Sequence, residues 1–294
     1  MHSLDLIFDS THYLSENEGA QVMNELGIER LSVFGMPPVE MVTLAADLGC
    51  SCIGIGLTPI RRYNPHGYSD WSLRDDPRLR REMSAAMRDL GVRLSLLEGF
   101  GVVSGQEMDR FARDLDILCE LGGERINVVS IEPDLARAIA GFAKLAEMAQ
   151  ARGLLVSTEI GPGPVTSLAS ALDVVRGVSL PNFSLLIDTM HYFRFGGTVE
   201  GLGVIDPSLI GYVQLCDVPL ISTFKSYMDE AFHERMVPGE GELPLQAFVS
   251  LLPKDVVVSL EVPRRALAQA GAEPIERVRP CVEAARSLLS HRRL

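Results

Sequence analysis

The feature that most constrains this chain is a regular alternation of short apolar runs with longer segments of helical periodicity. Eight runs rich in Val, Ile and Leu are expected to be strands, at residues 31–34, 51–57, 92–97, 125–130, 154–159, 183–188, 212–216 and 256–261. Between them, apolar residues recur every three to four positions, as they do on one face of a helix. Strands that are apolar along their whole length predict a parallel sheet covered by helices on both faces.

Glycine and proline mark the ends of the expected helices. These helices span residues 38–48, 77–90, 106–121, 134–152, 165–176, 245–251 and 274–290. Gly49, Gly91, Gly122 and Gly153 each follow one of them, where the left-handed backbone that ends a helix favours glycine. Together, the eight strand–helix units predict a single (β/α)₈ TIM barrel.

The barrel is expected to occupy residues 29–294, and residues 1–28 are expected to form an N-terminal arm or a cap. An open doubly wound sheet is the alternative fold. That fold would place a glycine-rich phosphate turn after its first strand. The sequence at residues 35–38 reads Gly-Met-Pro-Pro and is not such a turn.

Charge and cysteine content exclude several classes of protein. The net charge of −12, from 27 Lys and Arg against 39 Asp and Glu, disfavours binding to nucleic acid or to an anionic membrane. Five cysteines without framework spacing argue against a disulfide-stapled secreted protein. The N-terminal stretch does not read as a signal peptide, and no apolar run is long enough to span a bilayer. We therefore expect a cytoplasmic location.

Four successive strands carry a residue with a side-chain oxygen at or near their ends: Glu159, Asp188, Gln214 and Glu261. Parallel strands of a barrel bring such residues to one rim, where barrel enzymes carry their active sites. Buried carboxylates that converge repel one another unless a cation lies among them. Three carboxylates and an amide form a hard oxygen site that suits Mn²⁺ or Mg²⁺, with Co²⁺ and Zn²⁺ as alternatives. The sequence thus predicts one divalent metal ion.

The pattern of these strand ends resembles the xylose isomerase-like superfamily of sugar phosphate isomerases and epimerases, from about residue 31 onward. The residues that carry the resemblance are Glu159, Asp188-x-x-His191, Gln214-x-x-Asp217 and Glu261. The stretches VQLCDVP at 213–219 and PGEGELP at 238–244 look most like the hydroxypyruvate isomerase branch, although many members have His in place of Gln214. The resemblance implies that Glu159, Asp188, Gln214 and Glu261 bind the metal. It also implies that Glu159 and Glu261 act as acid and base.

The reaction implied is enolisation of a small polyhydroxy ketone, aldehyde or keto-acid. The leading prediction is a metal-dependent isomerase or epimerase that works through an enediolate. The alternative is a lyase or dehydratase on a cyclic or 3-keto substrate, as in 3-dehydroshikimate and inosose dehydratases. A DNA-repair endonuclease is disfavoured by the acidic charge and by only six histidines, and retention of both glutamates argues against a non-catalytic binding protein. A homodimer is expected.

Several further residues are predicted to surround the substrate: Arg61, Glu98, His191, His233 and Arg235. Arg61 lies in a loop rich in aromatic and cationic residues, at 58–71, that could cover the site or simply pack on the barrel. Glu98 could bind substrate hydroxyls or pair with an arginine such as Arg61. The segment that holds His233 and Arg235 could also be a solvated loop. Asp217 is expected to hold a neighbour in place by hydrogen bonding, with Arg235 as a candidate.

Overall fold

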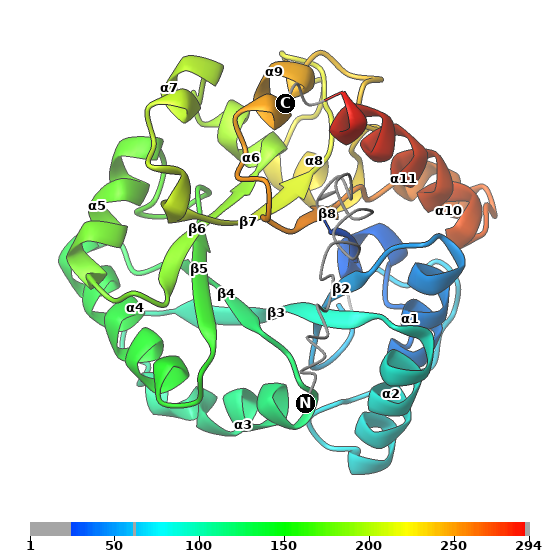
Figure 1. Ribbon diagram of the computed structural model, residues 1–294, viewed down its shortest axis with the longest axis horizontal. Helices are drawn as coiled ribbons and strands as arrows, with labels where there is room; N and C mark the ends of the chain where they lie inside the picture. Colours follow the sequence, from blue (N-terminus) through cyan, green and yellow to red (C-terminus); the bar gives the residue numbers. More distant parts are fainter. Residues whose placement is uncertain (1–24, 61–62, 292–294) are drawn as a thin grey trace, which may run out of the picture.

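The structure is a computed structural model that describes residues 25–60 and 63–291. Eight parallel strands pair in chain order, and β1 also pairs with β8, so that the sheet closes into a barrel (Figure 1). The strands are β1 (Leu26–Glu29), β2 (Cys52–Gly56), β3 (Arg93–Val102), β4 (Arg125–Ser130), β5 (Leu155–Glu159), β6 (Phe183–Asp188), β7 (Ile210–Leu215) and β8 (Val258–Leu260). The predicted (β/α)₈ barrel is confirmed, and an open doubly wound sheet is excluded.

Helices surround the strands on the outside of the barrel (Figure 1). The α-helices are α1 (Pro38–Asp47), α2 (Pro77–Leu90), α3 (Ala112–Glu120), α4 (Leu135–Gln150), α5 (Leu168–Val178), α6 (Thr189–Arg194), α7 (Val199–Gly203), α8 (Tyr227–His233), α9 (Leu245–Ser250), α10 (Arg265–Gln269) and α11 (Pro274–Ser290). Short 3₁₀ helices are η1 (Arg30–Val33), η2 (Met108–Phe111) and η3 (Pro207–Leu209). In the part of the chain that is described, no helix combines the length and the apolar character required to cross a bilayer.

The first strand lies earlier than the sequence predicted. Residues 31–34 were expected to be this strand, but η1 covers most of them and β1 ends at Glu29. β1 therefore includes residues 26–28, which were assigned to the N-terminal arm. η1 is a short 3₁₀ turn that contains apolar residues. Over only four residues, the spacing of apolar positions cannot distinguish such a turn from a strand. Residues 1–24 of the predicted arm lie outside the described residues.

Two layers of apolar side chains hold the barrel together. The larger layer lies between strands and helices, and a small cluster of Leu96, Leu186 and Tyr212 is separate from it. Every residue of β1, β2 and β8 is buried. Strands with both faces covered explain why these runs are apolar along their whole length instead of alternating. The polar residues at the rim are therefore supported by closely packed, buried strands.

Strand register places the polar strand ends side by side. Asp188 on β6 pairs with Gln214 on β7, and Gln214 pairs with Ser259 on β8, two residues before Glu261. Glu159 is the last residue of β5, which pairs with β6. The side chains predicted from four separate strands therefore lie at the same end of the barrel, as parallel pairing requires.

Candidate active site

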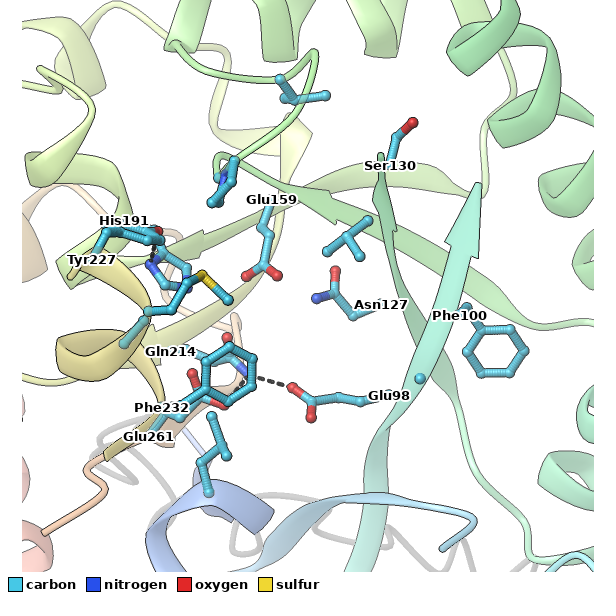
Figure 2. Close-up of a pocket in the computed structure, with 18 of the residues that line it drawn as sticks. Glu98, Phe100, Asn127, Ser130, Glu159, His191, Gln214, Tyr227, Phe232 and Glu261 are labelled. Atoms are coloured by element: carbon cyan, nitrogen blue, oxygen red, sulfur yellow. Dashed lines mark hydrogen bonds between the residues drawn. The ribbon is translucent and has the colours of Figure 1, made fainter. Parts of the chain in front are cut away.

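A cavity of about 300 Å³ opens among the strand ends at this rim. That volume lies at the small end of the ~300–1,000 Å³ typical of small-molecule sites. Figure 2 shows Glu98, Asn127, Glu159, Gln214 and Glu261 pointing into one common space. The remaining wall is largely apolar and includes Phe100, Val129, Ile131, Val165, Met228 and Phe232. The cavity therefore combines a polar floor with apolar sides, as small-molecule sites commonly do.

Glu159 is the carboxyl group of β5 that lines this cavity. Burial, reinforced by the nearby charges of Asp188 and Glu98, raises its pKa from the ordinary 4.5 to about 8. A hydrogen bond from Asn127 on β4 acts in the opposite direction. A carboxyl group with a pKa close to neutral can both accept and release a proton under physiological conditions. The strand end thus holds a group suited to proton transfer.

Asp188 and Glu261 are joined by one guanidinium group, that of Arg235. Its Nη1 lies 2.6 Å from Asp188 Oδ2 and 3.1 Å from Glu261 Oε2, and the Arg235 side chain is only 1% exposed. Burial disfavours the charge of Asp188, but Arg235 and His191 hold the pKa of Asp188 below its usual range. Burial instead raises the pKa of Glu261 well above its usual range, although Arg235 opposes this shift. Arg235 therefore offsets the negative charge of Asp188 more fully than that of Glu261.

Gln214 and Arg30 connect Glu98 to the rest of the site. The amide Nε2 of Gln214 donates to Glu98 Oε1 at 3.1 Å and to Glu261 Oε1 at 3.4 Å, as Figure 2 shows. Arg30, which follows β1, donates from Nε to Glu98 Oε2. The arginine partner of Glu98 is therefore Arg30. Arg61, which was proposed for this role, lies outside the described residues.

Glu29, at the end of β1, is a fifth carboxyl group at this rim. It is fully buried, and Tyr212 donates a hydrogen bond of 2.8 Å to its Oε1. Burial and the charge of Glu98 raise the pKa of Glu29 to about 8. Its space exists because β2 has glycine at position 54, where an added Cβ would lie 1.8 Å from Glu29 Oε2. Glu29 was not among the predicted site residues.

These carboxylates provide the ligand atoms that a divalent cation requires. Glu29, Glu98 and Glu261 are the one set of three or more His, Cys, Asp or Glu side chains, among those described, whose ligand atoms lie within 4.8 Å of one another. The predicted ligands Glu159 and Asp188 belong to no such set among the described residues, and Nη1 of Arg235 lies between Asp188 and Glu261. Buried hard oxygen donors that repel one another fit a divalent ion by their chemistry.

His191 lies at the wall of the cavity beside Asp188. Its backbone N–H donates to Asp188 Oδ1 at 2.9 Å, and its Nδ1 lies 2.6 Å from the hydroxyl of Tyr227 on α8 (Figure 2). Burial lowers the pKa of His191 to about 4, so the ring is neutral at pH 7. Burial also raises the pKa of Tyr227 far above its usual range, so its hydroxyl is protonated. A neutral imidazole has one N–H donor and one acceptor nitrogen, so the tautomer of His191 sets which of Nδ1 and the Tyr227 hydroxyl donates this hydrogen bond.

Two other predicted residues have roles away from the cavity. His233 is not part of the cavity wall, because its ring packs edge-on against Tyr63 and its Nδ1 lies 3.4 Å from Asp229 Oδ1. Asp217 does hold its surroundings by hydrogen bonds, but it accepts them from the backbone N–H groups of Gly239 and Leu243. Arg235, proposed as its partner, binds other carboxylates. Asp217 therefore shapes the loop after β7.

The loop at 58–71 packs on the barrel in its described part. The indole N–H of Trp71 donates to the carbonyl of Gly35 at 3.0 Å, and the ring of Tyr63 packs edge-on against Phe34 at 4.8 Å. None of the described residues of this loop lines the 300 Å³ cavity. Of the two readings of this loop, packing on the barrel is the one that these contacts support.

Sequence reasoning missed Glu29, Arg30, Asn127 and Tyr227 as residues of the site. Glu29 ends an apolar run, Leu-Gly-Ile-Glu, as Glu159, Asp188 and Glu261 end theirs. Because the first strand was expected at residues 31–34, Glu29 did not stand at a predicted strand end. Asn127 lies inside β4 and not at its end, and Tyr227 belongs to a helix in the long segment after β7. Neither position carries a signal that periodicity can detect.

Comparisons with known proteins agree with this architecture. The model of the family described as xylose isomerase-like TIM barrel matches residues 42–286. A 3-dehydroshikimate dehydratase of Pseudomonas aeruginosa is 28% identical over 184 residues, which cover 58% of this chain and 29% of the relative. An inosose isomerase of Bacillus licheniformis is 28% identical over 145 residues, covering 47% of this chain and 50% of the relative. The chain thus spans less than a third of the dehydratase and half of the isomerase.

A solved structure of an IolI protein with a bound zinc atom superposes with a TM-score of 0.72. It is 17% identical, and the match covers 90% of this chain and 98% of that one. At this level of identity the likeness shows the fold alone. The family match extends over most of the sequence and includes the strands that carry Glu98, Glu159, Asp188, Gln214 and Glu261. The chain therefore belongs to the xylose isomerase-like TIM barrel family.

Proposed function

We propose that this chain is a divalent-metal-dependent enzyme that enolises a small hydroxy-carbonyl compound, with Glu159 and Glu261 as its acid and base. One observation carries the proposal. Both carboxyl groups line the same cavity, and burial raises the pKa of both above the usual range for glutamate. Proton transfer to and from carbon next to a carbonyl needs groups of this kind, because proton transfer is efficient when the catalyst titrates near the working pH.

Glu159, Asp188, Gln214 and Glu261 are the residues proposed to hold the metal ion, with Mn²⁺ or Mg²⁺ as the expected ion. A bound divalent ion would supply Lewis acidity to the substrate carbonyl and stabilise the negative charge that enolisation creates. The Nε2 of Gln214 is committed to Glu98 and Glu261, which leaves its Oε1 as the ligand atom. Arg235 keeps Asp188 ionised, and an ionised carboxylate is the form that binds a cation.

The side chains of the site would transfer the protons and orient the substrate. One of the two glutamates removes the proton beside the carbonyl, and the other returns a proton to the neighbouring carbon or to a departing hydroxyl. With Tyr227 donating to Nδ1, the imidazole proton of His191 would be on Nε2, where it would donate a hydrogen bond to a substrate oxygen. The Oδ1 of Asn127 is buried without a hydrogen-bond partner among the described residues, so it can accept one from a substrate hydroxyl. These two residues orient the substrate between the glutamates.

Loss of water from a cyclic hydroxy-keto acid is the outcome that we favour. The apolar side of the cavity, with Phe100 and Phe232, suits a ring that exposes few hydroxyl groups better than a fully hydroxylated sugar. The similarity to 3-dehydroshikimate dehydratases points to the same class of substrate. Isomerisation or epimerisation, which the sequence alone favoured, is the second candidate. The similarity to an inosose isomerase supports it, and it needs the same two glutamates.

Deuterium exchange followed by NMR tests the proposal. The metal-loaded protein is incubated in D₂O with 3-dehydroshikimate, inosose, ketoses and hydroxypyruvate, beside the variants Glu159→Gln and Glu261→Gln. We expect metal-dependent label next to the carbonyl of one compound, a loss of at least about 10²-fold in either variant, and loss of water as the net reaction. Glu132→Gln is the control, because Glu132 is buried but is not part of the cavity wall.

The possible outcomes separate the candidates. Exchange with isomerised product and no loss of water would select the second candidate. Exchange that survives in both glutamate variants would contradict the assigned roles, and a metal-loaded protein that exchanges no compound of the panel would contradict the proposed substrate class.

A further inference from the structure

The carboxylates of the rim exceed the cations that reach them. Glu29, Glu98, Asp188 and Glu261 face two guanidinium groups, those of Arg30 and Arg235. Arg235 is shared between Asp188 and Glu261, and Arg30 donates to Glu98. Glu29 has no ion pair among the described residues, although it is fully buried. An uncompensated buried carboxylate is costly, so this part of the rim needs another positive charge or a proton.

The oxygen atoms of this part are arranged around a common point. Glu29, Glu98 and Glu261 each offer an oxygen within 4.8 Å of the others. Two oxygens bound to one Ca²⁺-sized ion at about 2.4 Å can be as far apart as about 4.8 Å. The Oε2 of Glu29 is buried and accepts no hydrogen bond from the described residues, so it is available as a ligand. The other oxygen of Glu29 is oriented by the hydroxyl of Tyr212.

The backbone of β2 reserves the space for this arrangement. Gly54 faces the Glu29 carboxylate so closely that an added Cβ would lie 1.8 Å from Oε2 and 2.5 Å from Cδ. Any other residue at position 54 would displace the Glu29 carboxylate from its position beside Glu98 and Glu261. A glycine at this point of a barrel strand therefore has a specific consequence, because it allows Glu29 to approach the two other acids.

We propose that Glu29, Glu98 and Glu261 bind a second divalent cation, beside the ion assigned to Glu159, Asp188, Gln214 and Glu261, with Glu261 shared by the two ions. The inference goes beyond the proposed function, because it rests on the geometry of the Glu29 carboxylate and not on any reaction. A cation at this point would offset the charge that Arg30 and Arg235 leave uncompensated. It would also hold the carboxylates of Glu98 and Glu261 in place at the cavity wall.

Ion content measures the second site directly. The protein is dialysed against Mn²⁺ at increasing concentration, and bound metal is counted by mass spectrometry while the spin coupling of paired Mn²⁺ ions is followed by electron paramagnetic resonance. We expect two ions per wild-type chain with a coupled signal, and one ion without coupling in Glu29→Gln. Glu132→Gln removes a different buried carboxyl group and should keep both ions.

A second variant keeps the test decisive should Glu29→Gln fail to fold. Gly54→Ala leaves every carboxylate in place but displaces that of Glu29, so it should also lose one ion and the coupling. Gly101→Ala is the matched control, because an added Cβ on β3 meets its nearest atom at an ordinary 3.8 Å.

Two further results separate this inference from the proposed function. Asp188→Asn should lose the ion assigned to Asp188 but keep the one that depends on Glu29, so an unchanged ion content in Asp188→Asn counts against the proposed function alone. A wild-type chain whose single ion at millimolar Mn²⁺ is lost in Asp188→Asn and kept in Glu29→Gln would overturn the second site. Equal ion content in wild type and folded Glu29→Gln or Gly54→Ala would overturn it as well.

Discussion

Two sides of the barrel rim bury carboxylates in different ways. On the side of β6 to β8, Arg235 lies between Asp188 and Glu261 and is almost completely buried. On the side of β1 to β3, Arg30 pairs with Glu98 but stays 23% exposed, and Glu29 keeps an oxygen without a partner. The first side is held by a cation of the protein itself. The second side is left with a deficit of positive charge, and a deficit of this kind marks a place where a ligand or ion can bind.

The two sides also differ in how they make room for these charges. Arg235 follows α8, in the long segment after β7, and its Nε donates to the carbonyl of Ala231 at 3.1 Å. Glu29 and Arg30 instead project from the end of β1 and occupy space that Gly54 and Gly56 leave open on β2. On one side the loop after α8 provides the cation, Arg235. On the other side the glycines of β2, which have no side chain, provide the space for Glu29 and Arg30. Substitutions can test each device separately.

The largest effect is expected from Arg235→Met in metal-free protein. Removing one partner of a buried ion pair leaves Asp188 and Glu261 uncompensated, which should lower the free energy of unfolding by about 3–5 kcal/mol. Added Mn²⁺ should restore much of this loss, because a cation replaces the guanidinium. Urea unfolding with and without Mn²⁺ measures both effects.

Arg194→Met is the control for that experiment. Arg194 forms a buried ion pair with Glu230, at 2.7 Å, outside the proposed ligands. Its loss of stability should not respond to Mn²⁺. An equal metal response in the two variants would show that Arg235 does not compensate a metal site.

A smaller effect is expected from pH. Glu159 has a pKa of about 8 in the folded chain against an ordinary 4.5, so the folded state holds a proton that the unfolded state releases. The contribution of Glu159 is fully present below pH 4.5 and is lost as the pH rises through about 8. Between pH 5.5 and 7.5, metal-free wild type should lose on the order of 2 kcal/mol more stability than Glu159→Gln.

Urea unfolding of the chelated proteins at several pH values measures this difference. Mn²⁺ should stabilise wild type more at pH 7.5 than at pH 5.5, because the ion binds the deprotonated carboxylate. Parallel pH profiles for wild type and Glu159→Gln would contradict the raised pKa.

The smallest effect is expected from Gly56→Ala on the other side of the rim. The added Cβ would lie 2.2 Å from Nη1 of Arg30, which is the end of a flexible side chain and can move. We expect a loss of about 1 kcal/mol, at the low end of the range for overpacking. Gly101→Ala should be close to neutral in the same urea experiment. An unchanged free energy of unfolding in Gly56→Ala would mean that Arg30 does not need glycine at this position of β2.

The sequence by itself determined the barrel and most of the acidic residues at its rim, with Glu98 among them. Apolar strands followed by helices leave few alternatives to a closed parallel sheet, and a polar residue at the end of such a strand must lie at the rim. Glu159, Asp188, Gln214 and Glu261 could be placed there for this reason. The first strand was misplaced because a run of four residues is too short to distinguish a strand from a 3₁₀ turn, and Glu29 was missed with it.

Only the tertiary structure decided which charges meet. Gln214 and Glu98 are 116 positions apart, and Tyr212 and Glu29 are 183 apart, so their hydrogen bonds depend on closure of the barrel. The pairing of β1 with β8 brings the first and last strands together, and with them Glu29 and Glu261. Periodicity reports which face of an element is buried. It contains no information on which residues from distant elements share that buried space, because this depends on the packing of the complete barrel.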